Sequence, residues 1–299
     1  MIVNYRMLTF LIIQTMKHIN LFITMLFSFS ICFAQTPQRF MPGQQAALKR
    51  LQNLYDSLSP MQKNMFLTEI KHIMDPEVTI VQPGKTDDNP PSDAIILFDG
   101  SDLNKEWQES GFGPNRTMTL KPAVTWVIKD GAIEASQGSG SLTTKRSFED
   151  FQLHIEWKTP SVVAGEGQGR GNSGVVIQGN YEIQILDSYN NRTYRNGQAG
   201  AVYMQYAPLV NVSRKPGEWQ SFDIIYTSPR FKNDSTFFAP PRVTLFHNGV
   251  LIQNNVEIQG PTVSPGIPRY IIKAHGPAPI TLQRHSGTLA FRNIWIREL

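Results

Sequence analysis

The chain has 299 residues, of which 10% are aromatic, and a formal net charge of +4 at pH 7. Its 28 basic residues are scattered rather than clustered, which argues against a nucleic-acid partner. This length has room for one sizeable domain with accessory segments, and a single cysteine excludes disulfides within the chain.

Residues 1–34 have the pattern of a secretory signal. They contain no Asp or Glu, two basic residues (Arg6 and Lys17) and an apolar run over 21–33. The order of a basic start, an apolar centre and a small-residue exit predicts cleavage after Ala34.

The expected location is therefore secreted or periplasmic, at a bacterial cell envelope. The only cysteine, Cys32, lies inside the predicted signal, so the mature chain is expected to have none. An exported domain without disulfides must rely on its core, which favours a bacterial envelope protein. The apolar run is too short to span a bilayer comfortably, so no stable transmembrane segment is expected after cleavage.

Residues 35–81 are expected to be helical. Apolar residues recur at helical spacing in Gln44–Ser57, and Ser59-Pro60 is expected to cap a second helix. That helix carries an apolar stripe, which we expect to pack on the first helix or on the main domain: Met61, Met65, Phe66, Ile70 and Ile73. The Pro- and Asp-rich residues 82–93 are predicted to form a linker.

Residues 94–299 are expected to form an all-β domain. Short strands are separated by Gly, Pro and Asn turns without helical periodicity, which predicts an antiparallel sandwich or jelly roll. The expected strands are 94–98, 123–128, 131–135, 141–144, 151–158, 173–178, 181–187, 219–227, 242–247, 250–256, 269–273, 279–285 and 289–298.

Two hairpins are predicted within this domain. The first joins Ser173–Gln178 to Tyr181–Asp187 through a Gly179-Asn180 turn, and the second has an Asn248-Gly249 turn. On the return strand of the first hairpin, Glu182 and Gln184 share one face because side chains alternate along a strand. The glycine-rich segment 165–171 precedes a strand rather than a helix, so it is interpreted as a loop at the rim of a site.

Several polar residues are candidates for this site. Glu156 and His154 share one strand face, while Arg170 and Asn172 flank the first hairpin. Each of these residues could instead have a purely structural role. A Glu on an antiparallel strand, for example, usually only contacts solvent. Asp187 could instead cap the following turn, and His285 ends a strand. We expect Glu156, Glu182 and Gln184 to gather in one hollow of a curved sandwich.

No compact metal or nucleophile motif is present. The sequence has no His-Glu-x-x-His and no His-x-His, although ligands could still come from separate strands. Gly171-Asn-Ser-Gly lacks the strand–turn–helix setting of a serine nucleophile.

The domain resembles a known family through motifs that occur in the same order over 94–299. They are Ile96-Leu-Phe-Asp-Gly-Ser-Asp-Leu-Asn, Gly171-Asn-Ser-Gly-Val, Tyr181-Glu-Ile-Gln-Ile-Leu-Asp-Ser-Tyr, Pro216-Gly-Glu-Trp-Gln, His247-Asn-Gly-Val and Phe291-Arg-Asn-Ile-Trp-Ile-Arg. The chain is similar to the 3-keto-disaccharide hydrolase domain family, which includes 3-keto-glucoside 1,2-lyases and 3-keto-2-hydroxyglucal hydratases. The resemblance implies a concanavalin-like jelly roll. One departure is Gln283-Arg-His-Ser, where the family's pattern has Gln-Asp-His-Gly.

The resemblance also implies cleavage of the glycosidic bond of 3-keto-glycosides by proton abstraction at C2 and β-elimination, with hydration giving net hydrolysis. Under it, Glu182 is the expected base or a metal ligand, Glu156 is its partner or a second ligand, and His285 is the acid or a ligand. The substrate-binding candidates are Arg170, Asn172, Gln184, Asp187 and His154. One divalent metal ion would suit this chemistry and no organic cofactor is expected.

Two other functions stay open. One is a non-catalytic carbohydrate-binding module, because the same fold carries lectins. The other is a conventional β-glucanase, although Glu182-x-Gln184-x-x-Asp187 has an amide where such enzymes need a carboxylate. In each case a carbohydrate is the expected partner, and the oligomeric state is left open.

Overall fold

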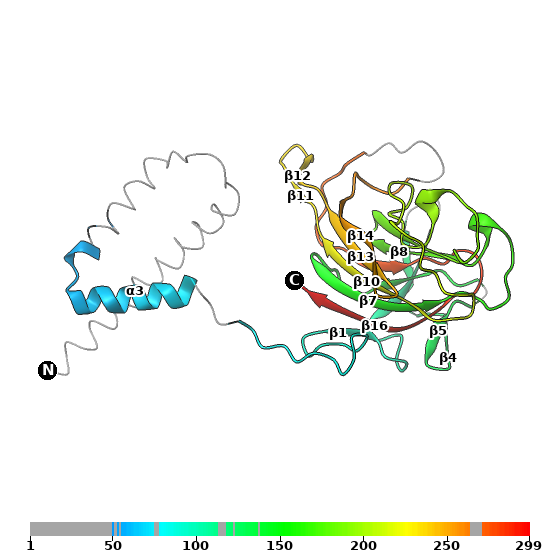
Figure 1. Cartoon of the computed structure of the whole chain (residues 1–299), viewed down its shortest axis with the longest axis horizontal. Coiled ribbons are helices and arrows are strands. Elements are labelled where there is room, and N and C mark those ends of the chain that lie inside the picture. Colours follow the sequence, from blue (N-terminus) through cyan, green and yellow to red (C-terminus); the bar gives the residue numbers. More distant parts are fainter. Residues whose placement is uncertain are drawn as a thin grey trace. The chain divides into compact units, whose positions relative to one another are not determined.

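The computed structural model describes residues 50, 53, 55–74, 78–112, 118–121, 123–136, 138–263 and 271–299. They fall into two compact units, residues 1–79 and 80–299 (Figure 1). No helix in the described part of the chain is long and apolar enough to cross a membrane. The predicted signal and most of the first predicted helix lie outside the described residues.

The first unit includes the helix α3 (Pro60–Met74), which confirms the predicted helix after Ser59. Gln62 N donates to Ser59 Oγ (3.4 Å) and Ser59 N donates to Gln62 Oε1 (2.9 Å), so the two residues cap the helix reciprocally. Of the predicted apolar stripe, Met61 and Met65 are exposed. The side chains of the other members lie outside the described residues.

The second unit contains two large antiparallel sheets, here called sheet A and sheet B. Sheet A runs β14-β13-β10-β7-β16-β5-β4, with β1 also paired to β16, and sheet B runs β3-β2-β6-β15-β8-β9. The strands of sheet A are β1 (Ile95–Phe98), β4 (Val127–Lys129), β5 (Ala132–Glu134), β7 (Phe151–Lys158), β10 (Gln220–Thr227), β13 (Arg242–His247), β14 (Val250–Glu257) and β16 (Ala290–Glu298). Those of sheet B are β2 (Trp107–Phe112), β3 (Met118–Lys121), β6 (Ser141–Thr144), β8 (Asn172–Ile177), β9 (Tyr181–Leu186) and β15 (Ile280–Leu282).

Shorter elements complete the unit. Strands β11 (Arg230–Phe231) and β12 (Phe237–Ala239) pair with each other. Two 3₁₀ turns, η2 (Gly167–Gly169) and η3 (Arg195–Gly197), lie in the loops that flank β8 and β9.

Sheets A and B pack face to face around one apolar core. On β7 the odd-numbered residues from Phe151 to Trp157 belong to this core, and on β9 the odd-numbered residues from Tyr181 to Ile185 do. The predicted all-β sandwich with a preceding helical segment is therefore confirmed. Because side chains alternate along a strand, the even-numbered residues of β7 and β9 lie on the two opposite outer faces.

The first hairpin turn differs by one residue from its prediction. Asn180 N donates to Ile177 O (3.0 Å), and the positive φ angles are at Gln178 (52°) and Gly179 (67°) rather than at Gly179 and Asn180. Gln178 is held there because its buried amide bonds to the Phe148 carbonyl oxygen (3.0 Å). The second hairpin has the expected turn, with Asn248 at 52° and Gly249 at 77°.

The predicted linker lies against sheet A. Asn293 Nδ2 and Trp295 Nε1 on β16 both donate to the Asp88 carbonyl oxygen, at 2.8 and 3.0 Å. Arg297 Nε forms an ion pair with Asp93 Oδ2 at 2.5 Å. Residues 82–93 thus belong to the compact unit formed by 80–299.

Candidate functional site

Glu182 and Gln184 lie together on the outer face of sheet B, as their alternation on β9 predicts. In the register of the hairpin, Glu182 is opposite Val176 and Gln184 is opposite Gly174 on β8. Opposed residues of an antiparallel pair point to the same face, so these four residues share one surface. It is here called the B face.

The B face continues on the other side of β9 through the segment 200–203. An isolated bridge pairs Ile183 with Val202, and Tyr203 N donates to the Glu182 carbonyl oxygen at 2.9 Å. Tyr203 is therefore the cross-strand neighbour of Glu182 on the B face. Its hydroxyl lies 2.5 Å from that of Tyr194.

The Glu182 carboxyl is buried and has no ion-pair partner among the described residues. It lies directly over Gly174, where an added Cβ would be 2.5 Å from Glu182 Oε1. Burial raises the pKa of Glu182 to about 7. A carboxyl with this pKa is suited to both accepting and returning a proton near neutral pH.

An amide network surrounds this carboxyl. The Gln184 nitrogen faces Gln168 Oε1 (3.0 Å) and Asn172 Oδ1 (3.3 Å), whose own nitrogens already donate to main-chain carbonyl oxygens. In this setting the Gln184 oxygen is 3.3 Å from Glu182 Oε1, a contact that is attractive only when Glu182 carries a proton. With the amide turned over, the nitrogen donates to Glu182 Oε1 and to the Ser173 carbonyl oxygen (3.1 Å). In the first setting the Gln184 oxygen also lies 3.1 Å from the Ser173 carbonyl oxygen, and in the second it faces Gln168 Oε1 and Asn172 Oδ1. Only the contact with Glu182 depends on the protonation state of Glu182.

The predicted convergence of Glu156 with Glu182 is wrong. Glu156 is on β7 of sheet A and its side chain points away from the shared core, so it lies on the layer opposite the B face. Glu156 accepts bonds from Arg292 Nε (2.6 Å) and Asn293 Nδ2 (2.8 Å), both on β16. Burial opposes ionisation of Glu156, but the interactions with His154, Asn293 and Arg292 outweigh it and lower the pKa of Glu156 to about 2.

His154 shares the outer layer of sheet A with Glu156. Its buried ring stacks on Trp295, with ring centroids 5.3 Å apart, and its Nδ1 lies 2.6 Å from Asp223 Oδ1. Burial opposes protonation, but the bond to Asp223 and the nearby Glu156 carboxylate, 3.9 Å from Nε2, outweigh it and raise the pKa of His154 to about 9. This cluster accounts for His154 without any substrate.

The His154 cluster makes stability depend on pH. His154 is protonated more readily in the folded chain, so its contribution is complete below its ordinary pKa of 6.5 and is lost as pH rises through about 9. We expect the free energy of unfolding to fall across this window in urea titrations. Asp223→Asn should flatten the slope, and an unchanged slope in that variant would contradict the assignment.

Arg170 and Asp187 form a buried ion pair at the end of β9. Arg170 Nη2 lies 2.5 Å from Asp187 Oδ2, with side chains 10% and 4% exposed, and Arg170 Nη1 donates to the Tyr189 carbonyl oxygen. Asp187 accepts from Tyr189 N (3.3 Å), so the predicted turn cap is present. Arg170 Nε is buried without a hydrogen-bond partner among the described residues. The predicted role of Arg170 and Asp187 in substrate binding stays a prediction.

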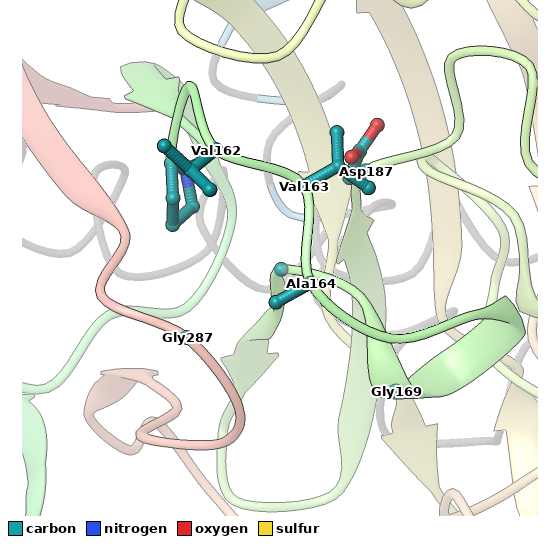
Figure 2. Close-up of a pocket in the computed structure, with 8 residues that line it drawn as sticks. Val162, Val163, Ala164, Gly169, Asp187 and Gly287 are labelled. Carbon is teal, nitrogen blue, oxygen red and sulfur yellow. The ribbon is translucent and has the colours of Figure 1, made fainter.

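Asp187 also lines a small cavity beside this pair. Figure 2 shows Gly287 and the segment 162–164 on separate loops around it. Its volume of about 60 Å³ holds a few water molecules but not a sugar ring.

His285 lies in the loop after β15 with an exposed side chain. The next residue ties this loop to the B-face hairpin, because Ser286 O accepts from Asn172 N (2.9 Å) and Ser286 Oγ donates to Arg170 O (2.9 Å). The loop is therefore at the Asn172 end of the site, and the role of His285 as an acid stays a prediction.

The donor set around Glu182 does not fit a protein-held metal ion. No three His, Cys, Asp or Glu side chains gather anywhere in the described ranges. The two predicted ligands, Glu156 and Glu182, lie in different sheets. The groups beside Glu182 are amides and phenols, which are weak ligands for a divalent ion.

Comparison with known proteins places this architecture in a family. Residues 93–297 match the model of the 3-keto-alpha-glucoside-1,2-lyase-like domain. The chain belongs to this family. The predicted 3-keto-disaccharide hydrolase resemblance is thereby confirmed, and the domain is a carbohydrate-active one of the glycosyl hydrolase or lyase kind.

One solved structure agrees with this placement. A crystal structure from Parabacteroides distasonis, named "putative glycosyl hydrolase", is 46% identical, covers 76% of this chain and 96% of its own, and has a TM-score of 0.67. Two further structures from that organism with the same name are 20% and 25% identical and have TM-scores of 0.48 and 0.45. Each covers 69% of this chain, and 94% and 99% of their own. No curated protein matches the chain.

Three residues of the site were missed by sequence reasoning. Gln168 is inside the glycine-rich loop that was interpreted as a rim, and no local pattern distinguishes its role. Tyr194 and Tyr203 follow the hairpin in a segment without strand alternation. Only the pairing of Val202 with Ile183 brings Tyr203 beside Glu182.

Proposed function

We propose that this domain cleaves the glycosidic bond of 3-keto-glycosides by β-elimination, with Glu182 as the base. The observation that carries the proposal is a buried carboxyl with a pKa of about 7, without a cationic partner among the described residues, on a face lined by amide and phenol groups. Amides and hydroxyls are the groups that orient sugar hydroxyls. The description of the family supports the 3-keto substrate.

The chemistry follows from the ketone. A carbonyl at C3 acidifies the C2 proton, which moves to Glu182 while the electron pair enters the C2–C3 bond and charge collects on O3. The electron pair on O3 then re-forms the C3 carbonyl, and a double bond forms between C1 and C2. The bond from C1 to the glycosidic oxygen breaks, and its electrons stay on the leaving oxygen. The leaving oxygen takes a proton, for which His285 is the predicted donor. Addition of water across the new double bond completes net hydrolysis.

One set of assays tests the proposal. The mature protein is incubated with a disaccharide and with its 3-keto form, with and without a chelator, while enone absorbance and released sugar are followed. Cleavage of the keto form alone supports the proposal, and cleavage of the unoxidised sugar contradicts it. Binding without turnover would instead identify a carbohydrate-binding module. Loss of activity with chelator would reveal a metal whose ligands include groups outside the described residues.

Gly174 offers a separate test of the Glu182 position. In Gly174→Ala the new Cβ would be 2.5 Å from Glu182 Oε1 and 2.9 Å from its Cγ, so the carboxyl must move. We expect kcat on the 3-keto-glycoside to fall by about 100-fold, since misplacement by about 1 Å has such an effect.

The matched control is Gly111→Ala on β2 of the same sheet, where the nearest atom to an added Cβ is Thr119 Oγ1 at 3.8 Å. Full activity in Gly111→Ala together with loss in Gly174→Ala is the expected result. Full activity in both would show that the Glu182 position does not matter.

We also propose that the protein is exported. The proposal depends on the signal pattern of residues 1–34, which lie outside the described residues. Fractionation of cells expressing the full chain, with N-terminal sequencing of the product, tests it. A chain that keeps its first 34 residues in the cytoplasm would contradict it.

A further inference from the structure

The reaction proposed above leaves one electrostatic requirement without a residue. Removal of the C2 proton puts negative charge on O3, and a stabilised enolate needs a hydrogen-bond donor at that oxygen. In either setting the Gln184 nitrogen donates to protein oxygens: Gln168 Oε1 and Asn172 Oδ1 in one, Glu182 Oε1 and the Ser173 carbonyl oxygen in the other. The donor must come from another group beside Glu182.

The phenols of Tyr194 and Tyr203 lie there as a bonded pair. Tyr203 is the cross-strand neighbour of Glu182 in an antiparallel arrangement, where facing Cα atoms are about 4.5–5.5 Å apart. Side chains that leave neighbouring strands on one face can reach adjacent atoms of one sugar, with a base at C2 and a donor at the carbonyl oxygen of C3. The charge of Glu182 also acts on Tyr194, so the pair and the carboxyl share one electrostatic environment.

The position of the pair is built into the backbone. The ring of Tyr194 lies on Gly197, where an added Cβ would be 2.1 Å from Tyr194 Cε2. Tyr203 is fixed by its main-chain bond to Glu182. The two rings are 6.3 Å apart between centroids, with the hydroxyl oxygens 2.5 Å apart.

Proton counting shows what the pair can do. Two phenols carry two protons, and the bond between the hydroxyls uses one of them. One proton is therefore free to point outward. Either hydroxyl can be the donor within the pair. Tyr203 is the phenol whose backbone is bonded to Glu182, so the arrangement in which Tyr194 donates to Tyr203 leaves the free proton on the phenol next to Glu182. The bond that Tyr203 accepts makes it a stronger donor.

We propose that Tyr203 donates a hydrogen bond to O3 of the 3-keto sugar and stabilises the enolate, with Tyr194 as a positioning residue that donates to Tyr203. This inference rests on the proposed function, because it assigns the second group of the same reaction. No bond to Tyr203 is made or broken, and its proton remains on the phenol throughout.

A substrate without a leaving group isolates the enolate step. In 3-keto-1,5-anhydroglucitol the C2 proton can exchange with deuterium in D₂O, while C1 carries only the ring oxygen and no glycosidic leaving group. Exchange by the wild-type chain, followed by NMR, reports enolate formation alone. If the wild-type chain neither exchanges this proton nor cleaves 3-keto-glycosides, the proposed function fails, whatever the tyrosine variants do.

Tyr203→Phe is the decisive variant. We expect both exchange and kcat on the 3-keto-glycoside to fall by about 10²–10³-fold, as for removal of one oxyanion donor. Loss of cleavage with unchanged exchange would place the hydroxyl at the leaving oxygen and overturn the inference. Unchanged rates of both would also overturn it.

Tyr194→Phe tests the positioning role. We expect kcat to fall by about 10-fold with KM unchanged, and the double variant to be no slower than Tyr203→Phe, because both act through one hydrogen bond. Additive losses would contradict this dependence. Tyr206→Phe is the matched control: it removes a hydroxyl that accepts from Gln259 Nε2 (2.9 Å) in the same segment, and it should leave exchange and cleavage unchanged.

Discussion

Glu182→Gln is expected to lower kcat on a 3-keto-glycoside by about 10²–10⁴-fold while the sandwich stays folded, because an amide cannot accept the C2 proton. In the wild-type chain kcat/KM should rise with pH through about 7, where Glu182 loses its proton. Steady-state rates from pH 5 to 9, with circular dichroism as a check on folding, measure both effects. Full activity in the variant would remove Glu182 from the mechanism.

Glu182→Gln is expected to lower activity but to raise stability relative to the wild type at higher pH. The folded chain holds the Glu182 proton up to about pH 7, whereas the unfolded chain releases it near 4.5. Wild-type stability should therefore fall as pH rises between these values, by about 3 kcal/mol in total. Gln does not titrate, so the free energy of unfolding of the variant should increase relative to that of the wild type as pH rises. A variant that is less stable at pH 8 than at pH 5, relative to the wild type, would contradict the burial argument.

Glu156→Gln is the matched control for the activity loss. It makes the same carboxyl-to-amide change, on the outer face of sheet A, opposite the B face. Its loss of the bond to Arg292 affects stability, but the activity of the folded fraction should be unchanged. A large loss of kcat in Glu156→Gln would restore the idea of a shared site.

Asp187→Ala is expected to destabilise the domain by about 3–5 kcal/mol, because it leaves the charge of the buried Arg170 guanidinium without its ion-pair partner. Urea unfolding followed by tryptophan fluorescence measures the change. The exposed pair between Arg242 and Glu257 (41% and 53%) gives the comparison, and Glu257→Ala should cost less than about 1 kcal/mol.

A variant that fails to fold would leave the role of Asp187 in binding unresolved, so the pair is also replaced as a whole. In Arg170→Met with Asp187→Leu both charges are absent, and most of the stability should return. If this double variant is stable and keeps its KM for the 3-keto-glycoside, the pair is structural. If KM rises strongly in the stable double variant, the pair contacts substrate as the sequence suggested.

Strand alternation alone predicted much of the fold. The expected boundaries of 141–144, 151–158 and 242–247 agree with β6, β7 and β13, because apolar and polar residues alternate there over a buried core. Strand β2 was missed because Glu109 and Ser110 interrupt its apolar pattern. Glu109 is buried there because it accepts bonds from Thr125 and from the main chain of Gly140.

The sequence by itself determined that Glu182 and Gln184 share a face, because a period of two depends only on neighbouring residues. It also determined the sandwich and the family. Which strands carry that face, and what lies opposite it, depended on pairing between distant segments. The tertiary structure alone separated Glu156 from Glu182 by a whole sheet and brought Tyr203 beside Glu182, since register between distant strands is set by the packing of the common core rather than by local pattern.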